Sequence, residues 1–272
     1  MSRFQVKSAF LWFIVVEMKK KFILLLLAIF ISFSFSSCDS AESGLVVNQS
    51  VKVAVAANSL DYLAAYDYTV DKGYELLEFD SRQAAIVAVE NGKADYVVIN
   101  SNDATDKLLE SVSLSFVENT QYSVDYCAVF RKDSTALQKQ FNSAITQLKT
   151  DGVFDKINKS YRAGESYSSD NVTLNDGKIT VLCCPVFDSL LCFDESGNVK
   201  GKELDFISEM CNALSLEAEL IIIAEYDEMF TALNEGEGDV IISAVEHTAE
   251  LEADYLLSDI YNQTTFGVYK RK

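Results

Sequence analysis

Cys38 occupies the position in this chain that most directly indicates covalent chemistry. Three consecutive lysines at residues 19–21 precede an apolar run over residues 22–35, and small residues lead from that run to the cysteine. This order is typical of a signal peptide that ends in a lipobox, because cleavage there leaves a cysteine as the first residue. The sequence therefore predicts acylation of the Cys38 thiol.

This lipobox predicts the first boundaries of the chain. Residues 1–37 are the expected signal peptide, or residues 18–37 if Met18 is the start codon, and residues 38–50 are the expected lipid-anchored tether. A transmembrane anchor is the alternative, but the apolar run is shorter than the roughly 20 residues that a spanning helix needs. Diacylation would hold the protein on the extracytoplasmic face of a bacterial membrane, in the periplasm or at the cell surface.

Five further cysteines could carry thiol, disulfide or metal chemistry: Cys127, Cys183, Cys184, Cys192 and Cys211. An odd number cannot all pair within one chain, and their spacing matches no metal-ligand pattern. Cys183 and Cys184 end an apolar strand, which favours burial as small hydrophobic residues. A disulfide between Cys192 and one of these two stays open.

His247 is the only histidine, and it stands next to Thr248. It could act as a switchable donor in a binding site, or it could be a solvent-facing loop residue. No serine or cysteine is arranged with it as a hydrolytic triad requires. The sequence predicts no catalytic residue, no metal site and no cofactor.

The charge balance excludes one class of partner. Residues 1–37 contain five of the 23 basic and one of the 41 acidic residues, so the mature chain has 18 basic and 40 acidic residues and a net charge of −22. Such a chain is not expected to bind nucleic acid. We expect the lipid, rather than the protein surface, to hold it at an anionic membrane.

Short apolar strands that alternate with helical stretches are the elements that must position any site. Strands are expected over residues 51–57 and 94–100, and a second set over residues 178–184, 219–225 and 238–245. This pattern is typical of an α/β fold in which helices flank mostly parallel sheets. The polar segment between the sets, residues 163–178, reads as a linker or long surface loop.

The stretch ALQKQFNSAITQLKTDGVFDKINKSY places Leu137, Phe141, Ile145 and Leu148 on one helix face and breaks at Gly152. It resembles the C-terminal signature of family 3 solute-binding proteins, the extracytoplasmic receptors of polar amino-acid ABC transporters. The strand YSVDYCAVFRKDS is similar to the one by which that family crosses from its second lobe back to its first. VKVAVAANS and AIVAVENGKADYVVIN resemble parts of the second lobe.

After the linker, ITVLCCPVFDSLLCFDESGNVKGKELDFISEM resembles the beginning of the same family, and the rest of the chain resembles the remainder of its first lobe. The resemblance therefore runs in the order second half, then first half. We interpret this order as a circular permutation. A domain-swapped pair of chains would build the same interlobe site, and this alternative stays open.

The resemblance implies a two-lobed type 2 periplasmic-binding-protein fold. Its second lobe is expected over residues 51–127, its hinge over residues 128–132 and its first lobe over residues 133–272, including the linker at 164–177. The implied site lies between the lobes. Matching positions imply these ligand-binding residues: Tyr226, Thr248, Ser243, Ser59, Asn58, Asn100, Phe187 and Leu190. Thr248 and Ser59 could instead be helix caps, and Tyr226, Phe187 and Leu190 could be ordinary core residues.

Two positions depart from the family pattern. Leu251 stands where an arginine clamps the carboxylate of an amino acid, and Asn100 stands where an acid takes the ammonium group. Charge-assisted hydrogen bonds are about twice as strong as neutral ones, so both ends of a zwitterion lose their main partner. An ordinary α-amino acid is therefore not the expected ligand.

The resemblance implies the substrate-binding lipoprotein of an ABC-type transporter, which binds a small polar solute and delivers it to a permease. A ligand-sensing or partner-binding module on a degenerate binding fold is the first alternative. An enzyme like the cyclohexadienyl dehydratases, which are similar to this family, is the second. It is disfavoured because such an enzyme needs a placed acid, and the matching positions hold Asn100 and Leu251.

Overall fold

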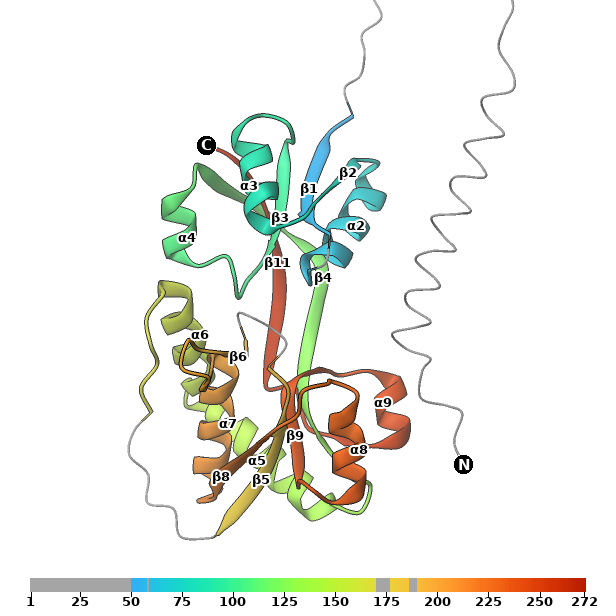
Figure 1. Ribbon diagram of the computed structural model, residues 1–272, viewed down its shortest axis with the longest axis vertical. Helices are drawn as coiled ribbons and strands as arrows, with labels where there is room; N and C mark the ends of the chain where they lie inside the picture. The colour runs from blue at the N-terminus through green and yellow to red at the C-terminus, as the bar shows by residue number, and fades with distance from the viewer. Residues whose placement is uncertain (1–49, 58, 170–176, 186–189) are drawn as a thin grey trace, which may run out of the picture. The chain divides into compact units, whose positions relative to one another are not determined.

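A computed structural model describes residues 50–57, 59–169, 177–185 and 190–272 (Figure 1). The chain divides into two units, Met1–Asn48 and Gln49–Lys272, and every described residue belongs to the second. Cys38, Asn58 and Phe187 lie outside the described residues, as do the expected signal peptide and the tether up to residue 49. No helix within the described ranges is long and apolar enough to cross a membrane.

Strands and helices alternate along most of the described chain. The strands are β1 (Lys52–Ala56), β2 (Glu75–Phe79), β3 (Tyr96–Asn100), β4 (Leu114–Phe130), β5 (Lys178–Cys183), β6 (Cys192–Phe193), β7 (Val199–Lys200), β8 (Glu217–Ile222), β9 (Val240–Glu246), β10 (Leu256–Leu257) and β11 (Asn262–Arg271). The helices are α2 (Asp61–Lys72), α3 (Arg82–Glu90), α4 (Asp106–Ser111), α5 (Thr135–Thr150), α6 (Val153–Ala163), α7 (Lys202–Ala213), α8 (Glu228–Glu235) and α9 (Ala249–Asp254).

Two parallel sets of strands are joined by an antiparallel pair. Among the described residues, the main sheet has the strand order β2-β1-β3-β11-β4-β9-β5-β8, with β10 on β4. β1 is parallel to β2 and β3, and we call these three strands the β1 set. β5 is parallel to β8 and β9, and we call these the β5 set. β4 and β11 run between the two sets and are antiparallel to their neighbours (Figure 1). The predicted α/β class with mostly parallel sets is confirmed.

The predicted helix with one apolar face is α5. Its buried residues include Phe141, Ile145 and Leu148, which recur at helical spacing and pack into the main core. α5 ends before Asp151, and Gly152 follows with φ +70°, a left-handed conformation that favours glycine. The predicted break is therefore confirmed, and α6 starts directly after it.

Four of the five described cysteines are buried, namely Cys127, Cys183, Cys184 and Cys211, and Cys192 is half-buried. The expected burial of Cys183 and Cys184 is confirmed, and all five are free thiols. Burial raises the pKa of Cys127, Cys183 and Cys211 to about 12. These three thiols therefore stay protonated at neutral pH and are poor nucleophiles.

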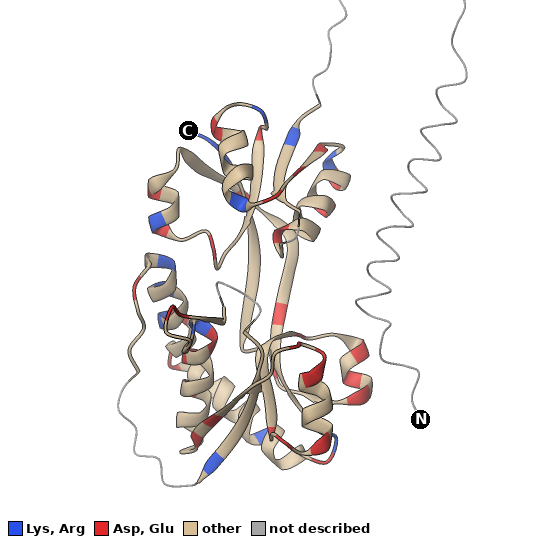
Figure 2. Ribbon diagram, in the orientation of Figure 1, with Lys and Arg blue, Asp and Glu red and all other residues tan. Residues whose placement is uncertain are grey.

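Acidic side chains dominate the helices outside the β5 set. In Figure 2 the ribbon of α8 and α9 is coloured red at acidic positions, and Glu228, Glu250 and Glu252 occupy the first helical turns. Negative side chains near a helix N-terminus are favoured by the helix dipole. These two helices therefore contribute to the negative charge read from the sequence, and they contain no basic residue.

Candidate functional site

The carboxyl ends of the two parallel sets meet along β11. Asn100, the last residue of β3, pairs with Phe266. Glu246, the last residue of β9, pairs with Tyr126 of β4, which pairs with Asn262. The end of β3 therefore lies level with Phe266 of β11, and the end of β9 lies level with Asn262. These two β11 residues are four positions apart, about 13 Å at 3.3 Å per residue. Ligands of open parallel sheets bind beyond the carboxyl ends of the strands, so a solute site is expected here.

Ser59 follows β1, Asn100 is the last residue of β3, and both have protein partners. The Ser59 hydroxyl donates to the carbonyl of Ala56 at 2.9 Å. The Asn100 amide nitrogen donates to Asp61 Oδ1 and to Asp103 Oδ2, each at 2.7 Å. Its oxygen accepts from the backbone N–H groups of Asn102 and Asp103. The buried Asn100 side chain is thus engaged within the protein on both its donor and its acceptor side.

Arg82 completes this group of residues. Its Nε lies 3.2 Å from Asp61 Oδ2, and its Nη2 lies 2.5 Å from Asp103 Oδ2. Burial raises the pKa of Asp61, while Arg82 and the hydrogen bonds from Asn100 lower it. We call Asp61, Arg82, Asn100 and Asp103 the β3 network. It fixes the turn that follows β3.

Ser243 lies in the middle of β9, and Thr248 lies beyond its carboxyl end. Ser243 is buried, accepts from the backbone N–H of Cys184 at 2.9 Å and donates to the carbonyl of the same residue at 3.1 Å. It therefore links β9 to the end of β5. The Thr248 hydroxyl accepts from the N–H of Leu251 at 3.3 Å, so Thr248 is the N-cap of α9, as the sequence indicated.

Tyr226, Leu190 and Leu251 lie in apolar surroundings. Tyr226 and Leu251 are partly buried against one core cluster, and the Tyr226 ring stands edge-on to Phe230 at 5.9 Å between centroids. Leu190 is fully buried in the main core. The structure thus surrounds the position expected for an arginine with hydrocarbon. His247 lies beside α9, with Nε2 3.4 Å from Glu252 Oε1.

Sequence reasoning missed a polar chain that crosses from α7 to β4. The Lys202 ammonium donates to Asn102 Oδ1 at 2.5 Å and to Asn158 Oδ1 at 2.9 Å. The Asn102 amide donates to Thr264 Oγ1 at 2.7 Å, and Thr264 donates to the Tyr126 hydroxyl at 3.1 Å. We call these five residues the Lys202 chain. Burial lowers the pKa of Lys202 to about 8, although Glu203 and Asp103 act in the opposite direction.

Glu203, the next residue, is fully buried and also escaped sequence reasoning. Its Oε1 accepts a short hydrogen bond from the Tyr261 hydroxyl and another, 2.8 Å long, from the N–H of Ala244. Ala244 has φ +49°, which is strained for a residue with a side chain. Burial raises the pKa of Glu203 against the lowering effects of Tyr261, Ala244 and Lys202, so the uncharged form is favoured.

The sequence does contain a signal for Glu203. It precedes Phe206, Ile207 and Met210 by three, four and seven positions, so helical periodicity places it on their buried face. Gly201 contributes as well, because a side chain there would collide with the carbonyl of Leu190. No comparable local signal exists for Asn102 or Thr264, whose partners are distant in sequence.

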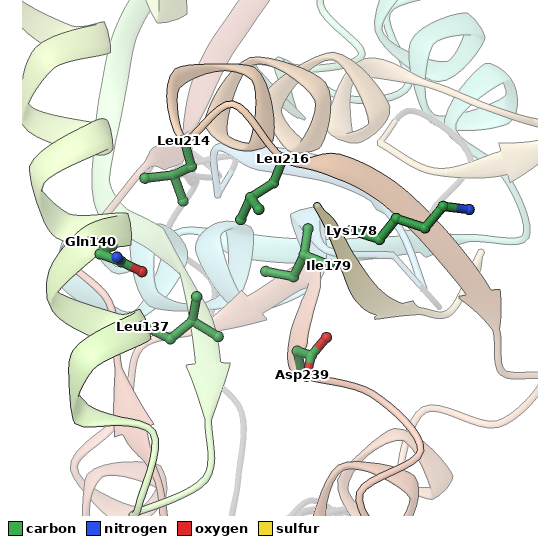
Figure 3. Close-up of a pocket in the computed structure, with 7 residues that line it drawn as sticks. All are labelled: Leu137, Gln140, Lys178, Ile179, Leu214, Leu216 and Asp239. Atoms are coloured by element: carbon green, nitrogen blue, oxygen red, sulfur yellow. The ribbon is translucent and has the colours of Figure 1, made fainter. Parts of the chain in front are cut away.

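A separate pocket of about 400 Å³ lies near the amino end of β5 (Figure 3). Lys178 and Ile179 open that strand, and Asp239 directly precedes β9. Leu214 and Leu216 close the pocket from the end of α7 and the segment that follows it. Because it lies at the amino ends of the parallel strands, it is not the solute site expected from the fold.

The site is therefore built from hydrogen-bonding groups and hydrocarbon. Within the described ranges, no cluster of three or more His, Cys, Asp or Glu side chains could hold a metal ion. The side chains brought to the carboxyl ends of the strands can position a small molecule by hydrogen bonds and packing.

Residues 179–272 match the sequence model of the bacterial extracellular solute-binding proteins, family 3. No curated protein matches the chain. One similar solved structure is the phosphate-binding protein of a phosphate ABC transporter from Streptococcus pneumoniae TIGR4, with 13% identity, 82% of this chain and 88% of that chain covered, and a TM-score of 0.45.

Two further similar structures were found. An ancestral amino acid-binding protein, a precursor of cyclohexadienyl dehydratase, has 13% identity over 82% of this chain and 81% of that chain, with a TM-score of 0.38. The substrate-binding protein of an amino acid ABC transporter has 14% identity over 82% of this chain and 85% of that chain, with a TM-score of 0.35.

Proposed function

Because residues 179–272 match the sequence model of the bacterial extracellular solute-binding proteins, family 3, we propose that this chain is the substrate-binding lipoprotein of an ABC-type transporter. It would bind a small polar solute outside the cytoplasm and deliver it to a membrane permease. Such a receptor only binds and releases its solute, and it makes or breaks no covalent bond. The proposal therefore assigns no catalytic residue and no cofactor.

The arrangement of the two parallel sets of strands supports this proposal independently of the family match. The carboxyl ends of the β1 and β5 sets lie only four β11 positions apart, so the segments that follow β3 and β9 converge on one region. Two parallel sets that present these ends to each other form the arrangement in which α/β proteins bind small ligands. Of the predicted residues, Ser59 follows β1, Asn100 ends β3 and Thr248 follows β9, whereas Ser243 lies within β9.

The lipid anchor at Cys38 is part of the proposal. The described fold begins with β1 at Lys52, so the expected tether leads directly into the β1 set. We propose that the chain forms the two lobes that the resemblance implies, in permuted order. The second lobe comprises residues 51–127, the hinge residues 128–132 and the first lobe residues 133–272. A permuted monomer then needs only the segment between α6 and β5 to connect the two halves of the family pattern.

The solute is proposed not to be a standard α-amino acid. Leu251 packs against apolar neighbours, and the Asn100 oxygen already accepts two backbone hydrogen bonds. Neither position offers the charged partner that one end of a zwitterion needs when it leaves water.

Native mass spectrometry of the gently purified full chain tests the function. We expect a small molecule to co-purify and to leave on mild denaturation. Calorimetry of the stripped protein should then show no standard amino acid binding more tightly than roughly 1 μM, about −8 kcal/mol. A submicromolar amino acid would contradict the ligand class but leave the receptor function standing. If the protein binds neither a co-purified molecule nor any solute from a spent growth medium, the receptor function itself is wrong.

A further inference from the structure

Lys202 is a buried cation that contacts amides instead of carboxylates. Its side chain is 5% exposed, and its ammonium donates to Asn102 and Asn158. No ion pair in the described part of the chain involves it. An ammonium carries three N–H donors, and a buried charge is unfavourable unless an opposite charge or a full set of hydrogen bonds compensates it. Besides these two amide oxygens, the ammonium faces the ring of Phe206 at 5.9 Å from its centroid. The third N–H donor therefore has no oxygen acceptor, and the charge no carboxylate partner, among the described residues.

A second unpaired donor lies on the neighbouring strand. Asn262 is 6% exposed, and its Nδ2 has no hydrogen-bond partner among the described residues. Asn262 pairs with Tyr126 across β11 and β4, and Thr264 follows two positions later. Paired residues and residues two apart share one face of a sheet, so Asn262, Tyr126 and Thr264 lie on the same face. The hydrogen bonds of the Lys202 chain lead from that face to the ammonium.

Tyr126 adds a third donor. Its oxygen accepts from Thr264, and in the described ranges its own proton has no acceptor. Burial raises its pKa, so the hydroxyl keeps that proton. The Lys202 chain therefore relates three donors to one another, an ammonium at one end and the phenol O–H of Tyr126 at the other, with the amide N–H of Asn262 on the same strand face as Tyr126. A set made only of donors, one of them charged, is complementary to an anion.

We propose that Lys202, Asn262 and Tyr126 bind the carboxylate of the solute, and that this solute is a small organic acid without an α-ammonium group. This inference rests on the proposed receptor function and names its substrate class. Leu251 stands where the family has an arginine, and in this proposal Lys202, at the start of α7, supplies the cation instead. A carboxylate held there would complete the hydrogen bonding of three buried donors.

The acidic groups around Lys202 explain why an ammonium is excluded. Asp103, beyond β3, is paired with Arg82 and Asn100. Glu203, on α7 itself, is bonded to Tyr261, and burial raises its pKa toward the uncharged form. The contact from α6 is the neutral amide of Asn158, and Tyr126 of β4 is reached only through Asn102 and Thr264. None of these groups offers a free carboxylate to a cationic ligand.

Three matched molecules test the inference on the purified full chain: propionate, its amide propionamide, and L-alanine, which is propionate with an α-ammonium. Each is titrated to about 50 mM at constant ionic strength while the unfolding temperature is measured, since ligands of this size reach only millimolar affinity. We expect propionate alone to raise the unfolding temperature. No shift by propionate beyond that of chloride, or equal shifts by propionate and propionamide, would overturn the inference.

Variants of Lys202 provide the second arm. Lys202→Gln should weaken propionate binding roughly 10- to 100-fold, and Lys202→Arg should restore part of it. Lys200→Gln, which removes the same charge from an exposed position two residues earlier, should leave binding unchanged. Binding that survives in Lys202→Gln would refute the assignment of this residue.

Measuring the propionate affinity of the unmodified chain over a series of pH values tests the inference without any variant, so it does not depend on whether a variant folds. Like other carboxylates, propionate stays ionised at every pH above about 6, so the series starts there, and the pKa of Lys202 is about 8. The affinity should therefore be constant below pH 8 and fall about tenfold per unit above it. A flat profile contradicts the inference. If a co-purified solute is found but propionate behaves as the amide does, only the carboxylate site fails, and the receptor function stands.

Discussion

Lys202 and Glu203 are neighbours in sequence, and burial moves both of their pKa values toward the uncharged form. For Lys202, a pKa of about 8 instead of 10.5 corresponds to roughly 3 kcal/mol of lost stability at neutral pH. Substituting such groups by hydrocarbon is often neutral or stabilising, so buried charges are weak evidence for stability. Strongly perturbed groups of this kind cluster at functional sites, which agrees with a role in ligand binding.

Glu203→Gln tests the protonation of the buried carboxyl. The folded-state pKa of Glu203 is raised, so its stabilising contribution is complete below the unfolded pKa near 4.5 and is lost as pH rises through the folded value. Glutamine resembles the protonated acid at every pH. We therefore expect the variant to lose less unfolding free energy than the native chain between pH 5 and 8, as measured by urea denaturation.

The exposed Glu217 supplies the control for this comparison. Glu217→Gln makes the same chemical change on β8 and should keep the pH dependence of the native chain. The glutamine at position 203 also places an amide donor where Oε2 has no partner, which costs about 1 kcal/mol at all pH values. Parallel pH profiles for the native chain and Glu203→Gln would show that Glu203 is ionised in the fold.

At the scale of elements, the β3 network shows how one turn is fixed by contacts from three segments. Asp61 opens α2, Arg82 opens α3, and Asn100 and Asp103 end β3 and follow it. The network contains two carboxylates and one guanidinium, and the neutral amide of Asn100 donates to both carboxylates. The neutral side chain of Asn100 therefore stabilises the turn after β3, because it donates a hydrogen bond to each of the two carboxylates.

Asn100→Asp should destabilise the protein. It replaces two donated hydrogen bonds by a third carboxylate within reach of Asp61 and Asp103, and an uncompensated buried charge costs roughly 3 to 5 kcal/mol. The loss should shrink as pH falls and the carboxylates protonate. Chemical denaturation at pH 7 and pH 5 measures both effects.

The double variant Asn100→Asp/Asp103→Asn is the matched control, because it returns the network to two carboxylates and one amide. We expect it to recover more than half of the lost unfolding free energy. Equal destabilisation by the single and double variants would mean that shape at position 100, rather than charge, decides the stability of the turn.

The elements were far more predictable than the contacts between them. The apolar spacing of α5, its end at Gly152 and the Thr248 cap follow from patterns within one or two turns, and the structure confirms them. The ligand-binding roles of Tyr226 and Ser243 stay predictions. The Lys202 chain was not predictable, because its hydrogen bonds join residues that are 44 to 162 positions apart in sequence and that only the folded chain brings together.

At the scale of the whole molecule, β4 and β11 are the elements that unite the two parallel sets into one sheet. β4 extends over 17 residues and pairs with β11 and β9, while β11 pairs with both β3 and β4. The expected tether enters the same sheet through β1. Attachment to the membrane is therefore expected to depend on the residues before β1 and not on the folded part.

Cys38→Ser should release the protein from membranes or leave it unprocessed, because serine offers no thiol for acylation. Fractionation of cells expressing the variant, with immunodetection of the soluble and membrane fractions, measures this. Cys192→Ser, which changes the half-buried thiol within the fold, is the control and should remain on the membrane. Normal processing and membrane attachment of Cys38→Ser would show that the lipobox assignment is wrong.

The shared pairing of β1 and β11 with β3 has a consequence for the speed of folding. Tyr96 of β3 pairs with Val53 on one side and Lys270 on the other, so the first and last strands lie about 10 Å apart. A few residues could join them, and the chain could then be opened between α6 and β5. In that rearranged chain β11 directly precedes β1, and its pairings with β3 and β4 become much more local. Lower contact order speeds folding, so refolding after dilution from urea should be faster than in the native order, while the folded contacts stay the same.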